Sequence, residues 1–232
     1  MNISTWSNRL LDTMVKADRA GAADLVAQVL ANGLPSNRVL AEVLDPALVR
    51  VGQLWEQEQA SLAQTFVAAK IAEDVLLRCL PEAGEASSHP PKGRVVIGNI
   101  EDDFHSLGRR IVASFLQAAG WEVHDLGNDV VAELFVDKAI EINAAVVGAS
   151  AMTHTTALNI RKLRTVIDAR GLAGQIKLAV GGAVFNWRPD LVAEVGGDGT
   201  AHNAAAADAL CARLQAETVR NAGSQATKEP TR

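Results

Sequence analysis

The sequence predicts an α/β protein in which an N-terminal four-helix-type bundle is followed by a doubly wound, flavodoxin-like parallel sheet of about five strands. Three observations support this fold class. Apolar residues up to position 80 recur at helical spacing, those after position 93 form short β-branched runs between helical segments, and a segment rich in proline, glycine and serine separates the halves. At 232 residues, the chain is long enough for two modest cores.

The first half, residues 1–80, is the predicted helical cap domain. Its apolar residues recur every third or fourth position, as between residues 40 and 51. Glycine and proline predict breaks at residues 20–21, 32–35 and 45–46. These breaks divide the segment into about four helices, the size of a small bundle.

Residues 81–93, PEAGEASSHPPKG, form the predicted linker, because proline, glycine and serine replace the apolar pattern there. The second domain is expected at residues 94–218. The tail, residues 219–232, has no apolar period, and we expect it to be disordered.

Short apolar runs predict the strands of the second domain. They lie at residues 94–100, 121–127, 144–150 and 176–182, with a short fifth strand near residues 197–200. Segments of helical period follow at residues 106–119, 131–142, 155–169 and 203–216. This alternation indicates parallel strands with helices on both faces.

The composition argues against two classes of partner. The formal net charge is −5, and lysines and arginines occur singly or in pairs such as Arg109 and Arg110, so we expect no direct nucleic-acid binding. No stretch approaches the ~18 consecutive apolar residues of a membrane helix, and the N-terminal residues lack a signal-peptide pattern. We therefore expect a cytoplasmic protein without a membrane partner.

Ligands of such sheets bind beyond the carboxyl ends of the strands, so the loops there are informative. The loop after the first strand lacks the GxGxxG of a dinucleotide site. Its acidic residues would repel the phosphate of a flavin mononucleotide. Asp102 and Asp103 match the acidic pair of a phosphate-accepting receiver, but the later Asp and Lys of a receiver are missing, with Ser150 and Ala201-His202 near those positions.

Three motifs remain at these strand ends. They are Asp103-x-His105-x-x-Gly108, then Ser150 at the end of the third strand, then the pair Gly181-Gly182. In order and spacing, residues 94–214 resemble the cobalamin-binding domain of corrinoid methyl-transfer proteins, B12-dependent methionine synthase and B12-dependent mutases. The corrinoid protein of methyltransferase systems is the most similar of these families.

The resemblance implies a cobalamin, as methylcobalamin or another corrinoid, whose cobalt takes His105 as its lower ligand in place of the cofactor's own base. A neutral imidazole is a good ligand for cobalt, and Asp103 can accept a hydrogen bond from the other ring nitrogen. The implied cofactor-binding set comprises Asp103, His105, Ser106, Gly108, Ser150, Met152, Thr153, Thr155, Gly181, Gly182 and Trp55, with His105 as the metal ligand. Taken singly, His105 also fits a surface histidine, Ser150 a helix cap, and Gly181-Gly182 a tight turn.

Residues 49–77 resemble, more weakly, the cap segment of methyl carriers and B12 sensors. Trp55 is then expected near the upper face of the corrin, although a tryptophan that packs between helices fits equally well. B12-dependent light sensors have a Glu-His pair about ten residues later, where this chain has Thr65 and Phe66. This difference counts against a sensor.

The resemblance therefore implies a corrinoid methyl carrier that shuttles a methyl group between partner methyltransferases. We expect a non-catalytic corrinoid subunit of a methyltransferase system rather than a stand-alone enzyme. The alternatives are a B12-dependent sensory or regulatory module that responds to light or redox state through a partner protein, and a cobalamin-free interaction module. The sequence leaves a homodimer open and does not identify the methyl donor or acceptor.

Overall fold

The structure, a computed structural model, describes residues 2–79 and 90–226, with the side chains of these residues up to Thr218. The chain divides into two compact units, Met1–Ala86 and Ser87–Arg232. Residues 81–89 of the predicted linker and residues 227–232 of the predicted tail lie outside the described residues.

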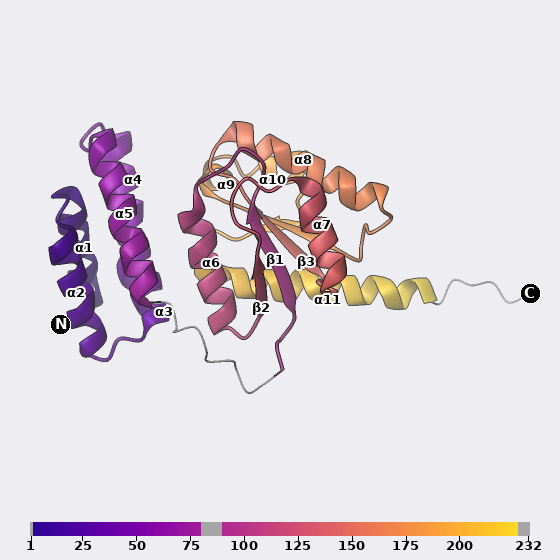
Figure 1. Ribbon diagram of the computed structural model, residues 1–232, viewed down its shortest axis with the longest axis horizontal. Coiled ribbons are helices and arrows are strands. Elements are labelled where there is room, and N and C mark those ends of the chain that lie inside the picture. The colour runs from indigo at the N-terminus through magenta and orange to yellow at the C-terminus, as the bar shows by residue number, and fades with distance from the viewer. Residues whose placement is uncertain (1, 80–89, 227–232) are drawn as a thin grey trace, which may run out of the picture. The chain divides into compact units, whose positions relative to one another are not determined.

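The first unit is helical (Figure 1). Its elements are α1 (Ile3–Val15), α2 (Arg19–Ala31), α3 (Ser36–Val39), the π-helical turn η1 (Leu40–Leu44), α4 (Asp45–Glu56) and α5 (Leu62–Cys79). Its core is formed by side chains that are buried on every helix, among them Leu10, Met14, Leu44, Ile71 and Leu76. Arg19 and Asp74 form an ion pair between α2 and α5, with 2.8 Å between Nε and Oδ2.

Two of the predicted helix breaks differ from the structure. The break expected at residues 20–21 lies earlier, where Ala17 adopts a positive φ of 57° and the Asp18 side chain caps α2 by accepting a hydrogen bond from the Gly21 amide. The break expected at Asp45-Pro46 does not occur. The amide of Asp45 donates instead to the Leu40 carbonyl across the wider π turn, and Pro46 is tolerated in the first turn of α4.

The second unit is the predicted parallel sheet with helices on both faces. Its strands are β1 (Arg94–Asn99), β2 (Glu122–Asp125), β3 (Val146–Ser150), β4 (Lys177–Gly181) and β5 (Gly199–Thr200). All neighbouring strands are parallel, in the order β2-β1-β3-β4-β5. This is the flavodoxin-like order, so the predicted fold class is confirmed.

Helices cover the two faces of this sheet. They are α6 (Ser106–Ala118), α7 (Ala132–Glu141), α8 (His154–Ala169), the short α9 (Ala183–Trp187) and α10 (Leu191–Glu194), a 3-10 turn η2 (Ala204–Ala206) and α11 (Ala207–Ala226). One core contains Phe135 and Ile160 of α7 and α8, and the other contains Leu116 and Leu214 of α6 and α11. The short helices α9 and α10 were not predicted.

Helix α11 is longer than expected. It continues beyond residue 216 to Ala226, so residues 219–226 of the predicted disordered tail have a helical backbone. The physical reason is that no proline interrupts the helix, since the first proline after Ala207 is Pro230. Within the described part of the chain, no helix is both long and apolar enough to span a membrane.

The register of the sheet aligns three residues at its carboxyl edge. Asn99 of β1 pairs with Ser150 of β3, which pairs with Gly181 of β4. Since side chains alternate along a strand, these residues share the face of the sheet that carries Ile97, Gly148 and Ala179 two positions earlier. Small residues therefore line the carboxyl-terminal parts of β3 and β4 on the face covered by α6 and α11.

Candidate functional site

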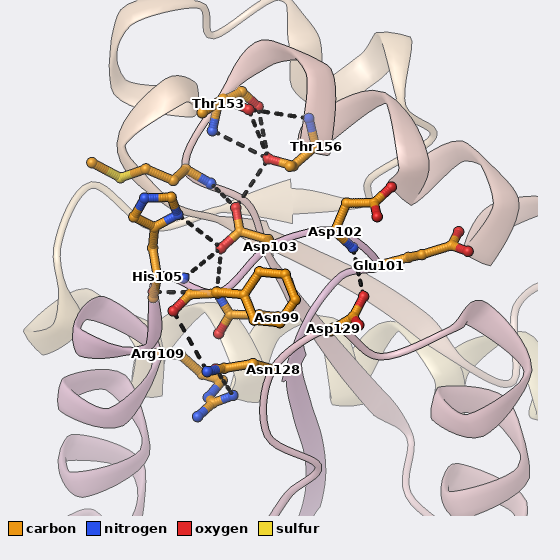
Figure 2. A network of polar contacts seen from close by, with 12 residues as sticks. Asn99, Glu101, Asp102, Asp103, His105, Arg109, Asn128, Asp129, Thr153 and Thr156 are labelled. Carbon is orange, nitrogen blue, oxygen red and sulfur yellow. Dashed lines mark hydrogen bonds and ion pairs between the residues drawn. The ribbon is translucent and has the colours of Figure 1, made fainter.

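A fully buried carboxylate lies at the centre of the loop between β1 and α6. Asp103 has no exposed surface, and it receives hydrogen bonds from three segments of the chain (Figure 2). Its Oδ1 accepts from the Asn99 amide Nδ2 at 2.7 Å and from the His105 backbone N–H at 2.9 Å. Its Oδ2 accepts from the Met152 backbone N–H at 2.6 Å and from the Thr156 hydroxyl at 2.9 Å.

These hydrogen bonds determine the charge state of Asp103. Burial alone would raise the pKa of this carboxyl, but the donors from Met152, His105, Asn99 and Thr156 stabilise the charged form and hold the pKa below its ordinary value. The carboxylate is therefore negative at neutral pH, directly behind the side chain of His105.

His105 lies immediately before α6 and projects outward. Its side chain is 60% exposed, and its ring Nδ1 lies 3.4 Å from Asp103 Oδ1. This distance is longer than that of a good N–H···O hydrogen bond, so the contact between the two groups is mainly electrostatic. Because the two ring nitrogens lie on different edges of the imidazole, Nε2 is left as the nitrogen available to a ligand.

The loop between β3 and α8 holds Asp103 from the other side. Thr153 and Thr156 cap the N-terminus of α8 reciprocally, each side chain bonding to the backbone N–H of the other residue. This cap orients the Thr156 hydroxyl toward Asp103. The resemblance also gave the Thr156 hydroxyl to the cofactor, together with those of Thr153 and Thr155, whereas the structure turns it toward Asp103. Asn99 does not belong to the predicted binding set, and its one sequence signal is an amide directly after the apolar run at residues 95–98.

The loop between β2 and α7 supports the Asp-x-His turn from below (Figure 2). The Asp129 backbone N–H donates to the Asp103 carbonyl at 3.1 Å, and its side-chain Oδ1 accepts from the Asp102 amide at 2.8 Å. Arg109 of α6 is buried and donates from Nη1 to Asn128 Oδ1 at 3.2 Å. The loop that carries His105 is thus fixed by neighbours from three segments.

The remaining predicted residues surround this carboxyl edge. Ser106 begins α6 and is half-buried, Ser150 is half-buried, and Met152, Thr153 and Thr155 are exposed. In the described part of the chain, the Ser150 hydroxyl makes no hydrogen bond.

Different physical constraints explain why glycine occupies the three predicted positions. Gly182 has φ +115°, and a Cβ atom there would lie 1.9 Å from the Ala151 carbonyl oxygen, so only glycine fits. Gly108 and Gly181 face open space, since a Cβ atom added at either position would have no neighbouring atom within 4 Å. They leave room beside His105 and Ser150.

Trp55, the predicted contact from the first unit, lies on α4. Trp55 is 44% exposed, and the apolar residues Leu62 and Phe66 of α5 are 71% and 63% exposed. It therefore differs from a tryptophan that packs fully between helices, such as Trp6 at 6%.

Comparison with known proteins identifies the family. A family model described as a B12 binding domain matches residues 93–209, and a second model of the same description matches residues 6–79. A trimethylamine corrinoid protein of Methanosarcina mazei is 33% identical over 190 residues, which cover 81% of this chain and 88% of that protein. The chain belongs to the B12-binding corrinoid protein family.

Solved structures agree with this family assignment. The monomethylamine corrinoid protein of Methanosarcina barkeri aligns with a TM-score of 0.79 and 26% identity, over 92% of this chain and all of that one. A methanol:cobalamin methyltransferase complex of the same organism aligns with a TM-score of 0.51 and 20% identity, over 94% of this chain and 84% of the matched chain. At that identity the second likeness concerns the fold alone.

The site's residues fit a corrinoid. Among the residues that the structure describes, no group of three or more His, Cys, Asp and Glu side chains could hold a metal ion. A single exposed imidazole backed by a buried carboxylate instead suits a metal that arrives already held in a macrocycle, which needs one protein ligand. The open space at Gly108 and Gly181 and the unbonded Ser150 hydroxyl supply room and a polar contact for a bulky ligand.

Proposed function

We propose that this corrinoid protein is a methyl carrier, in which His105 Nε2 is the lower ligand of the cobalt of a bound cobalamin. The cofactor supplies a metal that can hold a methyl group. The chain supplies the ligand, its orientation and the space around it. The form that carries the methyl group is methylcobalamin.

The observation that carries this proposal is the pairing of an exposed imidazole with a buried carboxylate. His105 is 60% exposed while Asp103 is fully buried, and Nδ1 faces Oδ1 at 3.4 Å. The negative carboxylate favours the tautomer with its proton on Nδ1, which leaves the Nε2 lone pair free for a metal. The four donors to Asp103 fix the carboxylate that orients the ring.

The other predicted residues have binding roles in this proposal. Gly108 and Gly181 leave space for the nucleotide tail, and the Ser150 hydroxyl bonds to its polar atoms. Met152, Thr153 and Thr155 are exposed after β3, and Ser106 begins α6 directly after His105. Trp55 provides an exposed aromatic surface in the cap unit for the upper face of the corrin.

A carrier also requires partners. Apart from the Asp103–His105 pair, we assign no acid, base or nucleophile to this site, and the residues described above serve binding and orientation. We therefore propose that partner methyltransferases load and unload the methyl group, and that this chain is their non-catalytic corrinoid subunit.

Titration of the full chain with hydroxocobalamin tests the proposal. The absorption spectrum is expected to change to that of a corrinoid whose own base has been displaced by histidine. His105→Ala is expected to lose this spectrum, whereas His202→Ala, at an exposed histidine outside the proposed set, is expected to retain it. An unchanged spectrum in His105→Ala would reject the proposal.

A light-exposure experiment separates a carrier from a B12-dependent sensor. A carrier loaded with adenosylcobalamin is expected to keep the same mass in solution before and after green light. A change in oligomeric state on illumination would favour the sensor instead. Protein that stays colourless with excess corrinoid would point to a cobalamin-free module.

A further inference from the structure

We infer that Asn99 is a positioning residue for His105, and this inference rests on the function proposed above. One amide nitrogen of Asn99 holds both groups that determine where the imidazole points. These are the carboxylate of Asp103 and the backbone of His105 itself.

The contacts of Asn99 close the Asp-x-His turn from the inside (Figure 2). Its Nδ2 donates to Asp103 Oδ1 at 2.7 Å and to the His105 carbonyl at 3.2 Å. The two N–H bonds of the amide are thus both used. Since Oδ1 also accepts from the His105 backbone N–H at 2.9 Å, the three residues form one closed polar unit.

The orientation of this amide is fixed by the two oxygens that its nitrogen faces, Asp103 Oδ1 and the His105 carbonyl. If the amide were rotated by half a turn, its oxygen would face the carboxylate and the His105 carbonyl, and three acceptors would meet without a donor. The observed orientation leaves Asn99 Oδ1 buried without a hydrogen-bond partner in the described part of the chain. A buried acceptor without a partner costs free energy.

This cost argues against a purely structural role. Asn99 has no exposed surface, and it shares its face of β1 with Val95 and Ile97. An apolar side chain of similar shape would continue that row and leave no unsatisfied oxygen. The amide is therefore best explained by the two groups to which its nitrogen donates. Both groups orient an imidazole that has little packing of its own.

The test compares Asn99→Leu with the wild-type chain in the hydroxocobalamin titration. We expect the affinity for the His-ligated form to fall by about 10 to 100-fold, as is typical when a residue that supports a metal ligand is lost. The melting temperature of the corrinoid-free protein is also expected to fall, because the buried Asp103 carboxylate loses one of its four donors, so the spectrum of the bound corrinoid is the decisive readout. A residue with only a structural role would shift the melting temperature and leave the spectrum of the bound corrinoid unchanged.

A second variant keeps the test decisive if the leucine variant does not fold. Asn99→Thr retains one hydroxyl donor, which can bond to Asp103 or to the His105 carbonyl but not to both. We expect its affinity to fall between those of the wild type and Asn99→Leu. An affinity equal to the wild type would contradict the bridging role.

Asn159→Leu is the matched control. Asn159 also donates from Nδ2 to a carbonyl of the same loop, that of Glu101, at 3.0 Å, and to Asp102 Oδ2 at 3.3 Å. Among the described residues it makes no hydrogen bond to Asp103 or His105. This variant is expected to keep the wild-type spectrum and affinity. A wild-type spectrum and affinity in Asn99→Leu would overturn the positioning role of Asn99 and leave the proposed function intact. Failure of the wild type to show His ligation would overturn the proposed function itself.

Discussion

Nδ1 of the exposed His105 ring lies 3.4 Å from Oδ1 of the fully buried Asp103. The carboxylate is rigidly held because each of its oxygens accepts two hydrogen bonds. The ring, in contrast, is exposed on most of its surface. The direction of an otherwise loosely packed side chain is thus set by a charge in the interior of the domain.

Asp103→Asn is expected to destabilise the second unit. The substitution replaces one acceptor oxygen by an NH2 group that faces existing donors, so we expect a loss of about 2–4 kcal/mol at pH 7. Asp190→Asn is the control, since that carboxylate is 60% exposed in an ion pair with Arg188 and is expected to contribute much less to stability than Asp103. Urea unfolding of both variants measures the difference, and equal losses would contradict the account.

The contribution of Asp103 is expected to depend on pH. Its pKa is lowered in the folded protein, where its hydrogen bonds outweigh the effect of burial. Its stabilising effect is therefore complete above the unfolded pKa of about 3.9 and is lost as the pH falls through the lower folded value. Unfolding measured from pH 7 down to about pH 3 should show the wild type and Asp103→Asn converging below about pH 4. A difference that stays constant over this range would contradict the assignment of charge.

The two adjacent glycines are expected to respond differently to alanine. Gly182→Ala places a Cβ 1.9 Å from a backbone oxygen at φ +115°, so we expect a loss of more than about 2 kcal/mol or failure to fold. Gly181→Ala faces open space and is expected to leave the melting temperature nearly unchanged. It should nevertheless weaken corrinoid binding roughly tenfold, because the added methyl group fills part of the space proposed for the nucleotide tail. Unchanged corrinoid affinity in Gly181→Ala would mean that the tail binds elsewhere.

Two tryptophans of the first unit provide a similar contrast. Trp6→Ala removes a side chain that is 6% exposed, and we expect a loss of about 3–5 kcal/mol from the helical unit. Trp55 is 44% exposed, so Trp55→Ala should lower the stability by less than about 1 kcal/mol while weakening corrinoid binding in the same titration. Unchanged binding would remove Trp55 from the proposed cofactor contacts.

Much of the fold could be predicted because the strands are dense in β-branched residues. The strand at Val146–Ser150 is bounded by helical segments, and this alternation of strands and helices indicates a parallel sheet. The helix break predicted at Pro46 was wrong for a physical reason, since a π turn absorbs the geometry that proline would otherwise disrupt. Local propensity does not encode such a turn.

The site could be predicted only in part. The spacing of Asp103, His105 and Gly108 is local in sequence, so the motif is visible without a structure. The support of Asp103 is not local, because Thr156 lies 53 residues away and reaches the carboxylate only through the pairing of β1 with β3. Asn99 is near in sequence, but its function depends on the direction of its amide.

Electron paramagnetic resonance of the reduced, Co(II) form of the bound corrinoid tests the central claim most directly. The splitting of the signal reports the nuclear spin of the axial nitrogen. Protein grown with 15N-histidine and loaded with unlabelled cobalamin is expected to show a doublet, because the coordinated nitrogen belongs to His105, and His105→Ala should lose the doublet. A triplet that is unaffected by the label would show that the nitrogen comes from the cofactor and would contradict the account.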